Sequence, residues 1–430
     1  MRILWLHIRN SPVRWALPVL IALDVAVLFL RTNYWVGVWP ETGAAAQVPA
    51  YLVGVLGAGA AAWAATATAR HGLVEQAAAA RVRPAVSEGY RLSATIVILL
   101  VPYLVGQATG FIMTARTFPP GLHLWLGYFA VGVFVTLFAA AVGWTMGKIF
   151  GSGLAPLVAA LAFLVLLGLL DRQGSAIVIT GLPSMTVDPV ILTVRFAAVT
   201  ALLMALLWVP AGARLRGRYL PLPAAAATVL IGVLTSTAIA VPREPAQDQA
   251  TCIPGPAVLC VWPEHEKYLP RLEEMSGRIA ALPDAFVLPP RMNEHGIDPG
   301  SQFGNRIDLR MSNPEAAPYF LIIEGSPWSY AGGIESAITS ATFNFQGTED
   351  CAWHTMTEAD MVRLEVFSAW LEAYLVGGAI PDYQTNAPAE MQQNWADGRA
   401  RLRDLSQDEQ FLWAEGEVRE IRGRYCTSGE

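Results

Sequence analysis

Charged residues are scarce in this chain of 430 residues. Asp, Glu, Lys and Arg together make up 15% of the residues, whereas hydrophobic residues make up 54%, and the mean hydropathy is +0.40. Soluble globular domains have about 25% charged residues, so this balance argues against a soluble two-domain protein and is typical of a membrane protein. The length exceeds that of one usual domain, which predicts more than one folded part.

Cysteine is absent from the first 251 residues, and the four cysteines that follow are Cys252, Cys260, Cys351 and Cys426. An even number confined to one part of the chain predicts two disulfides, which persist outside the cytoplasm. Three pairings are possible. The expected one joins Cys252 to Cys260 across the Pro254–Pro256 turn, and Cys351 to Cys426. The alternative is that all four are unpaired, buried thiols.

The common motifs of zinc and nucleotide sites are also missing. The chain contains no C-x-x-C pair and no H-E-x-x-H sequence, which argues against a zinc site. The nearest match to a phosphate-binding loop, Gly143–Lys148, has the wrong glycine spacing, and Ile149 stands where Ser or Thr would bind magnesium. We therefore expect no ATP hydrolysis by this chain, and we interpret Lys148 as a charge that marks the cytoplasmic side.

Three histidines of the second half, His265, His295 and His354, lie near glutamates in the sequence. A hydrolase needs a nucleophile with a base, or metal ligands at helical spacing, and none of these arrangements supplies both. We expect these histidines to be solvated or to cap helices. No catalytic residue, metal ligand or cofactor-binding residue is predicted on this chain, and no nucleic-acid partner is expected.

Seven apolar runs approach or reach the length of about 20 residues that a membrane-spanning helix needs. They are Trp15–Leu30, Val48–Ala67, Leu92–Thr114, Leu124–Met146, Leu154–Leu170, Val190–Val209 and Leu220–Val241. A cleaved signal peptide is an alternative for the first run, but no small-residue cleavage site follows Leu30. The pattern predicts a cytoplasmic interfacial helix over residues 1–14, a six-helix transmembrane core over 15–219 and a seventh, tethering helix over 220–241.

The distribution of charge divides the chain at Pro242. Up to Val241 there are 15 basic and 6 acidic residues, a net charge of +9, and beyond it there are 14 and 29, a net charge of −15, which sum to −6 for the whole chain. Basic cytoplasmic loops and an acidic outer domain explain this asymmetry. Seven crossings that start inside also end outside, where the cysteines place the last part. We therefore expect a multi-pass protein of the plasma membrane, with its N-terminus in the cytoplasm and residues 242–430 outside.

Residues 242–430 have the pattern of a globular α+β domain. The expected strands are Ala257–Trp262, Phe286–Leu288 and Tyr319–Ile323. Glu264–Leu282 is an expected helix with one apolar face, and Pro289–Pro318 is an expected long loop. Capping boxes that begin at Thr357 and Ser406 predict two more helices. The predicted fold class is a membrane all-α bundle followed by a disulfide-containing α+β extracytoplasmic domain.

Three polar residues, Asp24, Gln107 and Arg195, lie within the predicted spans. Ionisable groups at such depth are costly and usually face a cavity or a partner. Arg195 has a side chain long enough to reach Asp24. The interpretation we favour is that Arg195 snorkels to the outer interface, while Asp24 meets water or backbone.

The loop between the second and third spans contains the segment Gly72–Pro84, which favours a short helix ended by proline. Glu75, Arg81 and Arg83 are its polar anchors, because guanidinium groups pair well with carboxylates and Glu75 can bind a basic partner. The helix would dock on a cytoplasmic partner. The alternative is a solvated connector.

Several of these features together resemble actinobacterial permeases of the type-2 ATP-binding-cassette exporters. They are the interfacial N-terminal helix, the six spans, the Gly-Leu-x-Glu helix closed by Arg-x-Arg-Pro, and the Gly143–Pro156 connection between the fourth and fifth spans. This resemblance covers roughly the first 240 residues. It implies a membrane subunit that pairs with a second permease copy and two separate ATPase subunits, which hold the ATP and magnesium.

The seventh span and the tail resemble a subset of those permeases that carry an outer domain. The resemblance lies in Cys260–Pro263, a Cys-x-x-Pro step, and in Tyr268–Pro270, although Trp262 stands where the family is expected to have histidine. It implies that the outer domain caps or gates the exit of the substrate. One rival hypothesis is a membrane-anchored extracellular sensor or ligand-binding protein, and another is a membrane-bound peptidase-like enzyme.

Overall fold

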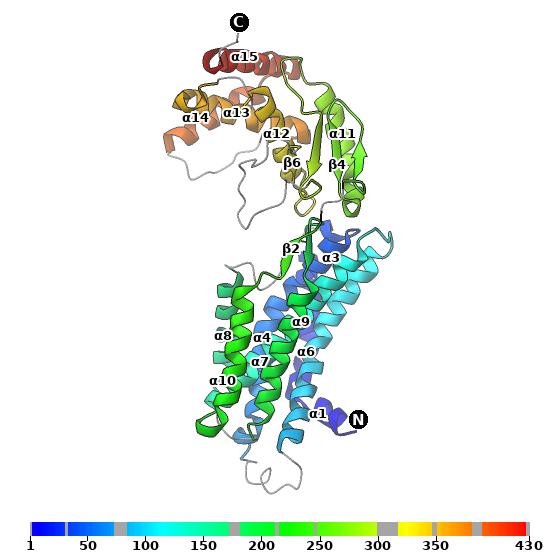
Figure 1. The fold of residues 1–430 in the computed structure, drawn as a ribbon, viewed down its shortest axis with the longest axis vertical. Helices are drawn as coiled ribbons and strands as arrows, with labels where there is room; N and C mark the ends of the chain where they lie inside the picture. Colours follow the sequence, from blue (N-terminus) through cyan, green and yellow to red (C-terminus); the bar gives the residue numbers. More distant parts are fainter. Residues whose placement is uncertain are drawn as a thin grey trace. The chain divides into compact units, whose positions relative to one another are not determined.

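A computed structural model describes residues 2–30, 33–72, 84–171, 181–210, 215–244, 247–298, 317–345, 351–380 and 389–426. The chain forms two compact units, Met1–Val241 and Pro242–Glu430 (Figure 1). The boundary falls where the net charge of the sequence changes sign. Each unit has its own cluster of buried apolar side chains.

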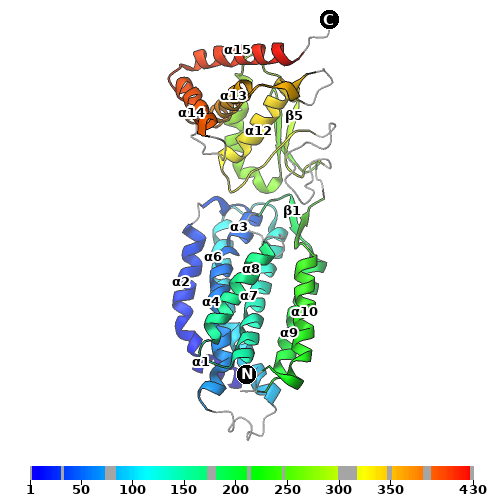
Figure 2. The same cartoon turned by 90° about the vertical axis from the view of Figure 1, so that its left-hand side faces the viewer.

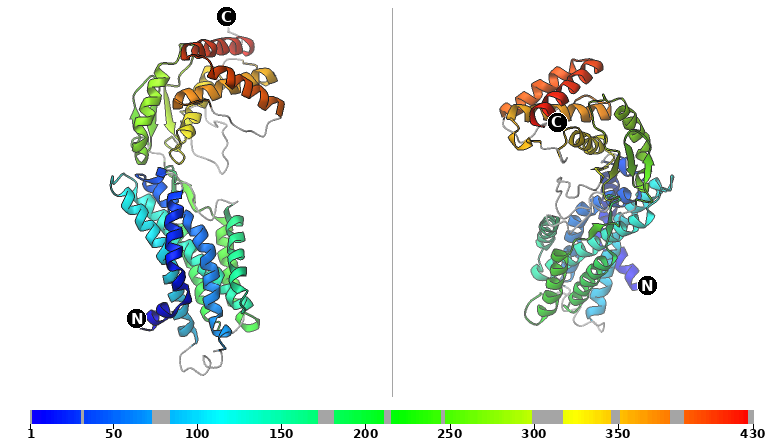
Figure 3. Two further views of the ribbon diagram at one scale, coloured as in Figure 1. Left: turned by 180° about the vertical axis from the view of Figure 1, so that it is seen from behind. Right: turned by 45° about the horizontal axis from the view of Figure 1, so that its top comes forward.

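The first unit is a bundle of helices. Its helices are α1 (Arg2–Asn10), α2 (Leu17–Leu30), α3 (Trp39–Ala45), α4 (Val48–Arg70), α6 (Pro84–Thr114), α7 (Leu122–Phe150), α8 (Ala155–Asp171), α9 (Pro189–Leu207) and α10 (Pro221–Ser236). The short strands β1 (Met185–Val187) and β2 (Ala240–Pro242) pair with each other. The amphipathic helix α1 lies beside the bundle near one of its ends, against α6 (Figure 3).

Six apolar helices in the described residues are long enough to cross a membrane. They are Val13–Leu30, Trp39–Thr68, Ala85–Thr114, Leu122–Phe150, Pro189–Leu207 and Gly217–Ser236. The fifth predicted run forms α8, whose apolar part, Ala155–Leu170, is shorter than these six helices. The structure is therefore compatible with a membrane protein, and six of the seven predicted spans reach full length.

Close packing of α7 on α4 holds the middle of the bundle together. A side chain at Gly143 would lie 2.2 Å from the carbonyl oxygen of Ala58, and one at Gly147 would lie 2.7 Å from the Cβ atom of Ala65. Glycine and alanine thus let the two backbones approach, which favours helix association in lipid. Since Gly143–Lys148 lies inside α7, it does not form a phosphate-binding loop.

The second unit combines a four-stranded sheet with helices. Its elements are β3 (Thr251–Ile253), β4 (Val258–Val261), α11 (Leu269–Ala280), β5 (Arg291–Glu294), β6 (Tyr319–Phe320), α12 (Pro327–Thr342), α13 (Glu358–Val376), α14 (Ala389–Arg403) and α15 (Gln407–Tyr425). The strand order is β3-β4-β5-β6, with β3 antiparallel to β4 and the other pairs parallel. Helix α15 crosses over α13 (Figure 2). This mixed sheet with helices is the predicted α+β class.

Several details of the predicted second unit are wrong. Phe286–Leu288 forms no strand, and β5 lies inside the segment Pro289–Pro318 that was expected to be a loop. The predicted helix Glu264–Leu282 begins as a 3-10 helix over Pro263–Tyr268 before α11. The polar sequence of β5 lacks the alternation that identifies a half-buried strand.

The predicted disulfides and helix caps are confirmed. Cys252 pairs with Cys260, and Cys351 pairs with Cys426. The Thr357 hydroxyl accepts a hydrogen bond from the Asp360 backbone at the start of α13, and Ser406 and Glu409 form a full capping box on α15. These features depend on neighbours in the sequence or on the pairing of a small number of cysteines, so the sequence alone predicts them well.

The two disulfides are expected to stabilise the second unit unequally. The Cys351–Cys426 bond spans 75 residues and the Cys252–Cys260 bond spans 8. Loop-closure entropy predicts a loss of about 4.5 kcal/mol on removing the long-range bond and about 2.5 kcal/mol on removing the short-range one. Thermal unfolding of the full chain should therefore show a larger fall in Tm for C351S/C426S than for C252S/C260S. Equal Tm values would contradict this account.

Candidate functional site

The residues that were expected to couple the chain to a partner, Glu75, Arg81 and Arg83, lie outside the described residues. The described chain ends at Gly72, just after α4, and resumes at Pro84, the first residue of α6. The candidate site is therefore built from the described side chains nearest to these two helix ends.

A buried ion pair joins the start of α6 to the end of α7. Glu88 and Lys148 are both almost fully buried, and the Lys148 Nζ atom lies 3.3 Å from Glu88 Oε2. Lys148 also donates hydrogen bonds to the carbonyl oxygens of Val209, at 3.2 Å, and Pro210, at 3.1 Å, just beyond α9. Three helices therefore meet at one ammonium group. The interpretation of Lys148 as no more than a topology charge is wrong, because the structure buries and pairs it.

Arg91 connects the same cluster to α4. Its guanidinium lies 2.9 Å from Glu88 Oε1, donates to Thr68 Oγ1 at 2.8 Å and donates to the carbonyl oxygen of Ala64. Arg91 also lies over the ring of Trp144 in α7. The helix before residues 73–83 and the helix after them are thus held together by one side chain.

This cluster of Glu88, Arg91 and Lys148 has two cations and one anion. The excess positive charge is offset by the carbonyl groups at the end of α9, since a helix C-terminus carries partial negative charge. Removing one partner from a buried ion pair leaves an uncompensated charge and typically costs about 3 to 5 kcal/mol. The cluster is therefore a firm connection among α4, α6, α7 and α9.

Asp24 of α2 is fully buried and packs directly on α6. A side-chain carbon at Gly106 would lie 1.8 Å from the Asp24 Oδ2 atom, so any larger residue there would require the Asp24 carboxyl group to move. Within the described part of the chain, neither carboxyl oxygen has a hydrogen-bond partner. Gln107, one residue further along α6, is also buried and donates to the Tyr103 hydroxyl at 2.9 Å. The structure shows no backbone partner of the kind expected for Asp24.

Arg195 of α9 is fully buried and donates to the carbonyl oxygen of Thr237, which follows α10. The guanidinium is thus enclosed by the protein at the end of α10, and the snorkelling of Arg195 to the outer interface stays a prediction. The alternative was an ion pair between Arg195 and Asp24. It is not formed among the described residues, since neither Asp24 oxygen has a hydrogen-bond partner there. Its role is to hold α9 against the end of α10, because the guanidinium satisfies a carbonyl group that the helix leaves free.

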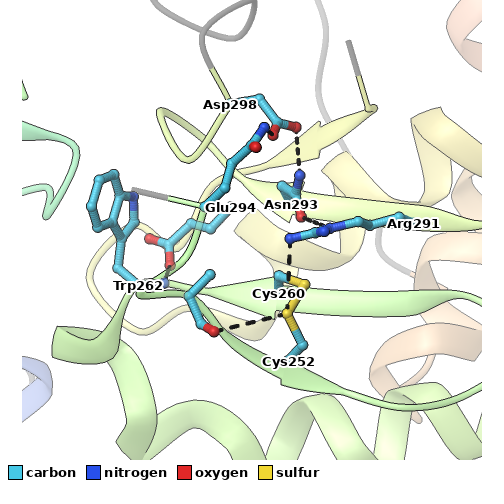
Figure 4. Close-up of a disulfide and its surroundings, with 9 residues drawn as sticks. Cys252, Cys260, Trp262, Arg291, Asn293, Glu294 and Asp298 are labelled. Atoms are coloured by element: carbon cyan, nitrogen blue, oxygen red, sulfur yellow. Dashed lines mark hydrogen bonds between the residues drawn. A yellow bond between two sulfur atoms is a disulfide. The ribbon is translucent and has the colours of Figure 1, made fainter. Parts of the chain in front are cut away.

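In the second unit, polar side chains gather where the parallel strands β4 and β5 end (Figure 4). His265 is fully buried, and its Nδ1 atom lies 2.7 Å from Glu294 Oε1. The other oxygen of Glu294 accepts the Trp262 backbone N–H at 3.0 Å, and the Trp262 indole N–H donates to the His295 carbonyl at 2.9 Å. His265 and His295 are both buried, so the prediction that they are solvated is wrong.

A second set of polar contacts continues along β5. Asn293 and Gln247 donate to the two carboxylate oxygens of Asp298, and Arg291 donates to Asn293 Oδ1 at 2.8 Å (Figure 4). Among the described residues, no group of three or more His, Cys, Asp or Glu side chains is placed to hold a metal ion. The contacts fix strand β5 and the residues that follow it, and they supply no metal centre in this part of the chain.

Sequence reasoning missed Glu88 as the partner of Lys148. A signal was available, because Glu88 lies three residues before Arg91 at the start of a predicted span, and acidic residues are rare in the first half. Only the fold reveals the partner, since 60 residues separate Glu88 from Lys148 in the sequence.

Comparison of the chain with protein-family models, with curated proteins and with solved structures gives no match.

The Glu88–Lys148 pair can be tested by a double-mutant cycle. We expect Glu88→Gln to destabilise the first unit by about 3 to 5 kcal/mol, because it leaves the buried Lys148 without its carboxylate. Lys148→Met should cost less, because Glu88 keeps its ion pair with Arg91. The double variant E88Q/K148M should be less destabilised than the sum of the two single variants. Lys267→Met is the matched control, since Lys267 is exposed and is the other lysine of the chain. Thermal unfolding in detergent measures these differences. An unfolding temperature for K148M equal to that of K267M would rule out a stabilising pair.

Proposed function

We propose that this chain is the membrane permease subunit of an ATP-binding-cassette exporter, which moves its substrate outward by means of a separate ATPase. The observation that carries the proposal is the buried cluster of Glu88, Arg91 and Lys148. It connects the two helices that flank residues 73–83 to α7 and to the end of α9.

Such a connection suits the transmission of force from a partner. An ATPase subunit that binds residues 73–83 and moves would act on the end of α4 and the start of α6. Arg91 makes these ends move together, and Lys148 passes the movement to α7 and α9. Because separating the buried charges is costly, the helices shift as a connected group rather than by breaking the cluster. Sliding of packed helices of this kind is a common means of conformational change.

The absence of a nucleotide motif from the sequence supports a separate source of energy. The nearest glycine-rich segment lies inside α7, where Gly143 and Gly147 contact α4 instead of forming a loop. ATP and magnesium therefore belong to the ATPase subunits. A second permease copy would complete the substrate path, and the outer domain would cap or gate its exit.

A second candidate is a membrane-anchored extracellular sensor or ligand-binding protein. One observation favours it, a cavity of about 840 Å³ between α12 and α13 of the second unit. Both functions place residues 242–430 outside the plasma membrane. They differ in the cytoplasmic partner, because only the exporter requires an ATPase.

The orientation in the membrane is tested with reporters. The basic first half and the disulfides motivate the prediction that a reporter enzyme fused after Glu430 is active only outside the cytoplasm. The same reporter inserted near Arg216 should be active only inside. A cytoplasmic C-terminus would contradict both candidate functions.

Coupling to the ATPase is tested with charge reversal in residues 73–83. Loss of a desolvated charged contact typically costs about 2 to 5 kcal/mol of binding, so R81E/R83E should fold in the membrane but lose its ATPase. The tagged full chain is purified from its native membrane in mild detergent, and the bound ATPase is identified and its turnover measured. Arg116→Glu, an exposed arginine that follows α6, is the control and should retain the partner.

Two results would change the proposal. Wild-type yield and activity of the ATPase with R81E/R83E would show that these residues do not couple the subunits. Failure of the unmodified chain to bring down any ATPase would favour the sensor instead.

A further inference from the structure

The second unit contains a cavity that none of the contacts above explains. It has a volume of about 840 Å³ and is lined by residues of β6, α12 and α13. Small side chains open the space on the α12 side, where Gly332, Gly333 and Ser336 contribute to the lining. Because this volume lies in the range of about 300 to 1,000 Å³ that is usual for small-molecule sites, the cavity can hold a small organic ligand.

One carboxyl group of this lining, that of Glu335, is buried. Only 9% of the residue is exposed, and one of its oxygen atoms accepts a hydrogen bond of 2.7 Å from the Thr339 hydroxyl. Burial raises the pKa of Glu335 to about 7, the hydrogen bonds of Thr339 and Ser368 oppose this shift, and the nearby charges of Glu372 and Glu365 add to it. A positively charged ligand would relieve the cost of ionising this group.

The charged side chains among the described residues that line the cavity are all acidic. Glu365 also lines it, and Glu372 lies close enough that a side-chain carbon at Gly332 would be 3.4 Å from the Glu372 carboxylate. None of the described residues that line the cavity is Lys, Arg or His. Among the described residues, the charged groups that act on Glu335 are the carboxylates of Glu365 and Glu372, so a ligand with a positive charge would be favoured there.

Part of the cavity lining is apolar. Phe345, Met361 and Leu364 belong to it, and Met361 is 48% exposed while Phe345 is 36% exposed. Exposed apolar side chains beside a few well-placed polar groups are typical of ligand sites. The cavity lining thus combines acidic side chains with exposed apolar ones.

We propose that this cavity binds a small organic cation, with its ammonium group at Glu335 and its apolar body against Phe345, Met361 and Leu364. This inference does not depend on the role of an ATPase. It assigns to the outer domain a ligand class that applies whether the chain is an exporter subunit or a sensor.

The probe for the test is phenethylamine, which is a cation at neutral pH and has an aromatic body. The neutral alcohol 2-phenylethanol has nearly the same shape and serves as the matched ligand. Titration calorimetry with the full chain in detergent at pH 8 should show that the amine binds at least about tenfold more tightly than the alcohol, because only the amine pairs with the buried carboxylate.

Glu335→Gln keeps the shape of the side chain and removes its charge. It should weaken binding of the amine by about tenfold or more and leave the alcohol little changed. Glu273→Gln, at an exposed position of α11 outside the cavity lining, is the control and should bind the amine as the unmodified chain does. Equal affinity of the amine for the unmodified chain and E335Q would overturn the proposal, as would failure of the unmodified chain to prefer the amine.

Lowering the pH gives an independent measurement. The groups that act on Glu335 are Thr339 on its own helix and Glu365, Ser368 and Glu372 on α13, while Tyr319 of β6 also lines the cavity. With a pKa of about 7, Glu335 is mostly neutral at pH 5 and mostly ionised at pH 8, while the amine stays charged at both values. Binding should therefore weaken from pH 8 to pH 5 in the unmodified chain. The same pH dependence in E335Q would contradict the assignment.

Discussion

The close approach of α7 to α4 is the constraint on which the first unit depends. Gly143 and Gly147 leave no room for a side chain against the backbone of α4, so the two helices pack at a fixed separation. This packing decides where the next residue, Lys148, points. Its ammonium group reaches Glu88 and the carbonyl groups that follow α9, and the buried charge is satisfied only because three helices meet there.

The parts of the fold that could be predicted from the sequence depend on residues close together in the chain or on the amino-acid composition of a segment. The apolar runs predict helices because about 20 apolar residues are needed to cross a bilayer, and six reach that length. The caps at Thr357 and Ser406 require residues only three positions apart. The disulfides were predictable because four cysteines allow only three pairings, and one of those pairings closes a short turn.

The parts that could not be predicted depend on distant partners. Strand β5 has the polar sequence Arg-Met-Asn-Glu, yet it lies between β4 and β6 because Glu294 and Asn293 find buried partners in Trp262, His265 and Asp298. Arg195 was expected at the outer interface, and no local pattern showed that it would be enclosed by the protein and bonded to the carbonyl group of Thr237 at the end of α10. In each case a residue that looks solvated from its sequence is buried by contacts that only the fold creates.

The connecting cluster of the first unit and the candidate ligand site of the second differ in how their buried charges are compensated. Glu88 has two cations beside it, and Asp360, at the start of α13, accepts hydrogen bonds from Tyr425, Thr357 and Arg424. Burial alone would raise the pKa of Asp360, but these contacts lower it to about 2, so its charge is fully satisfied within the protein. Glu335 has hydroxyl groups and further carboxylates around it and a cavity in front of it. Since burying a carboxylate is costly unless a positive charge compensates it, the described residues leave at Glu335 the place that a cationic ligand can fill.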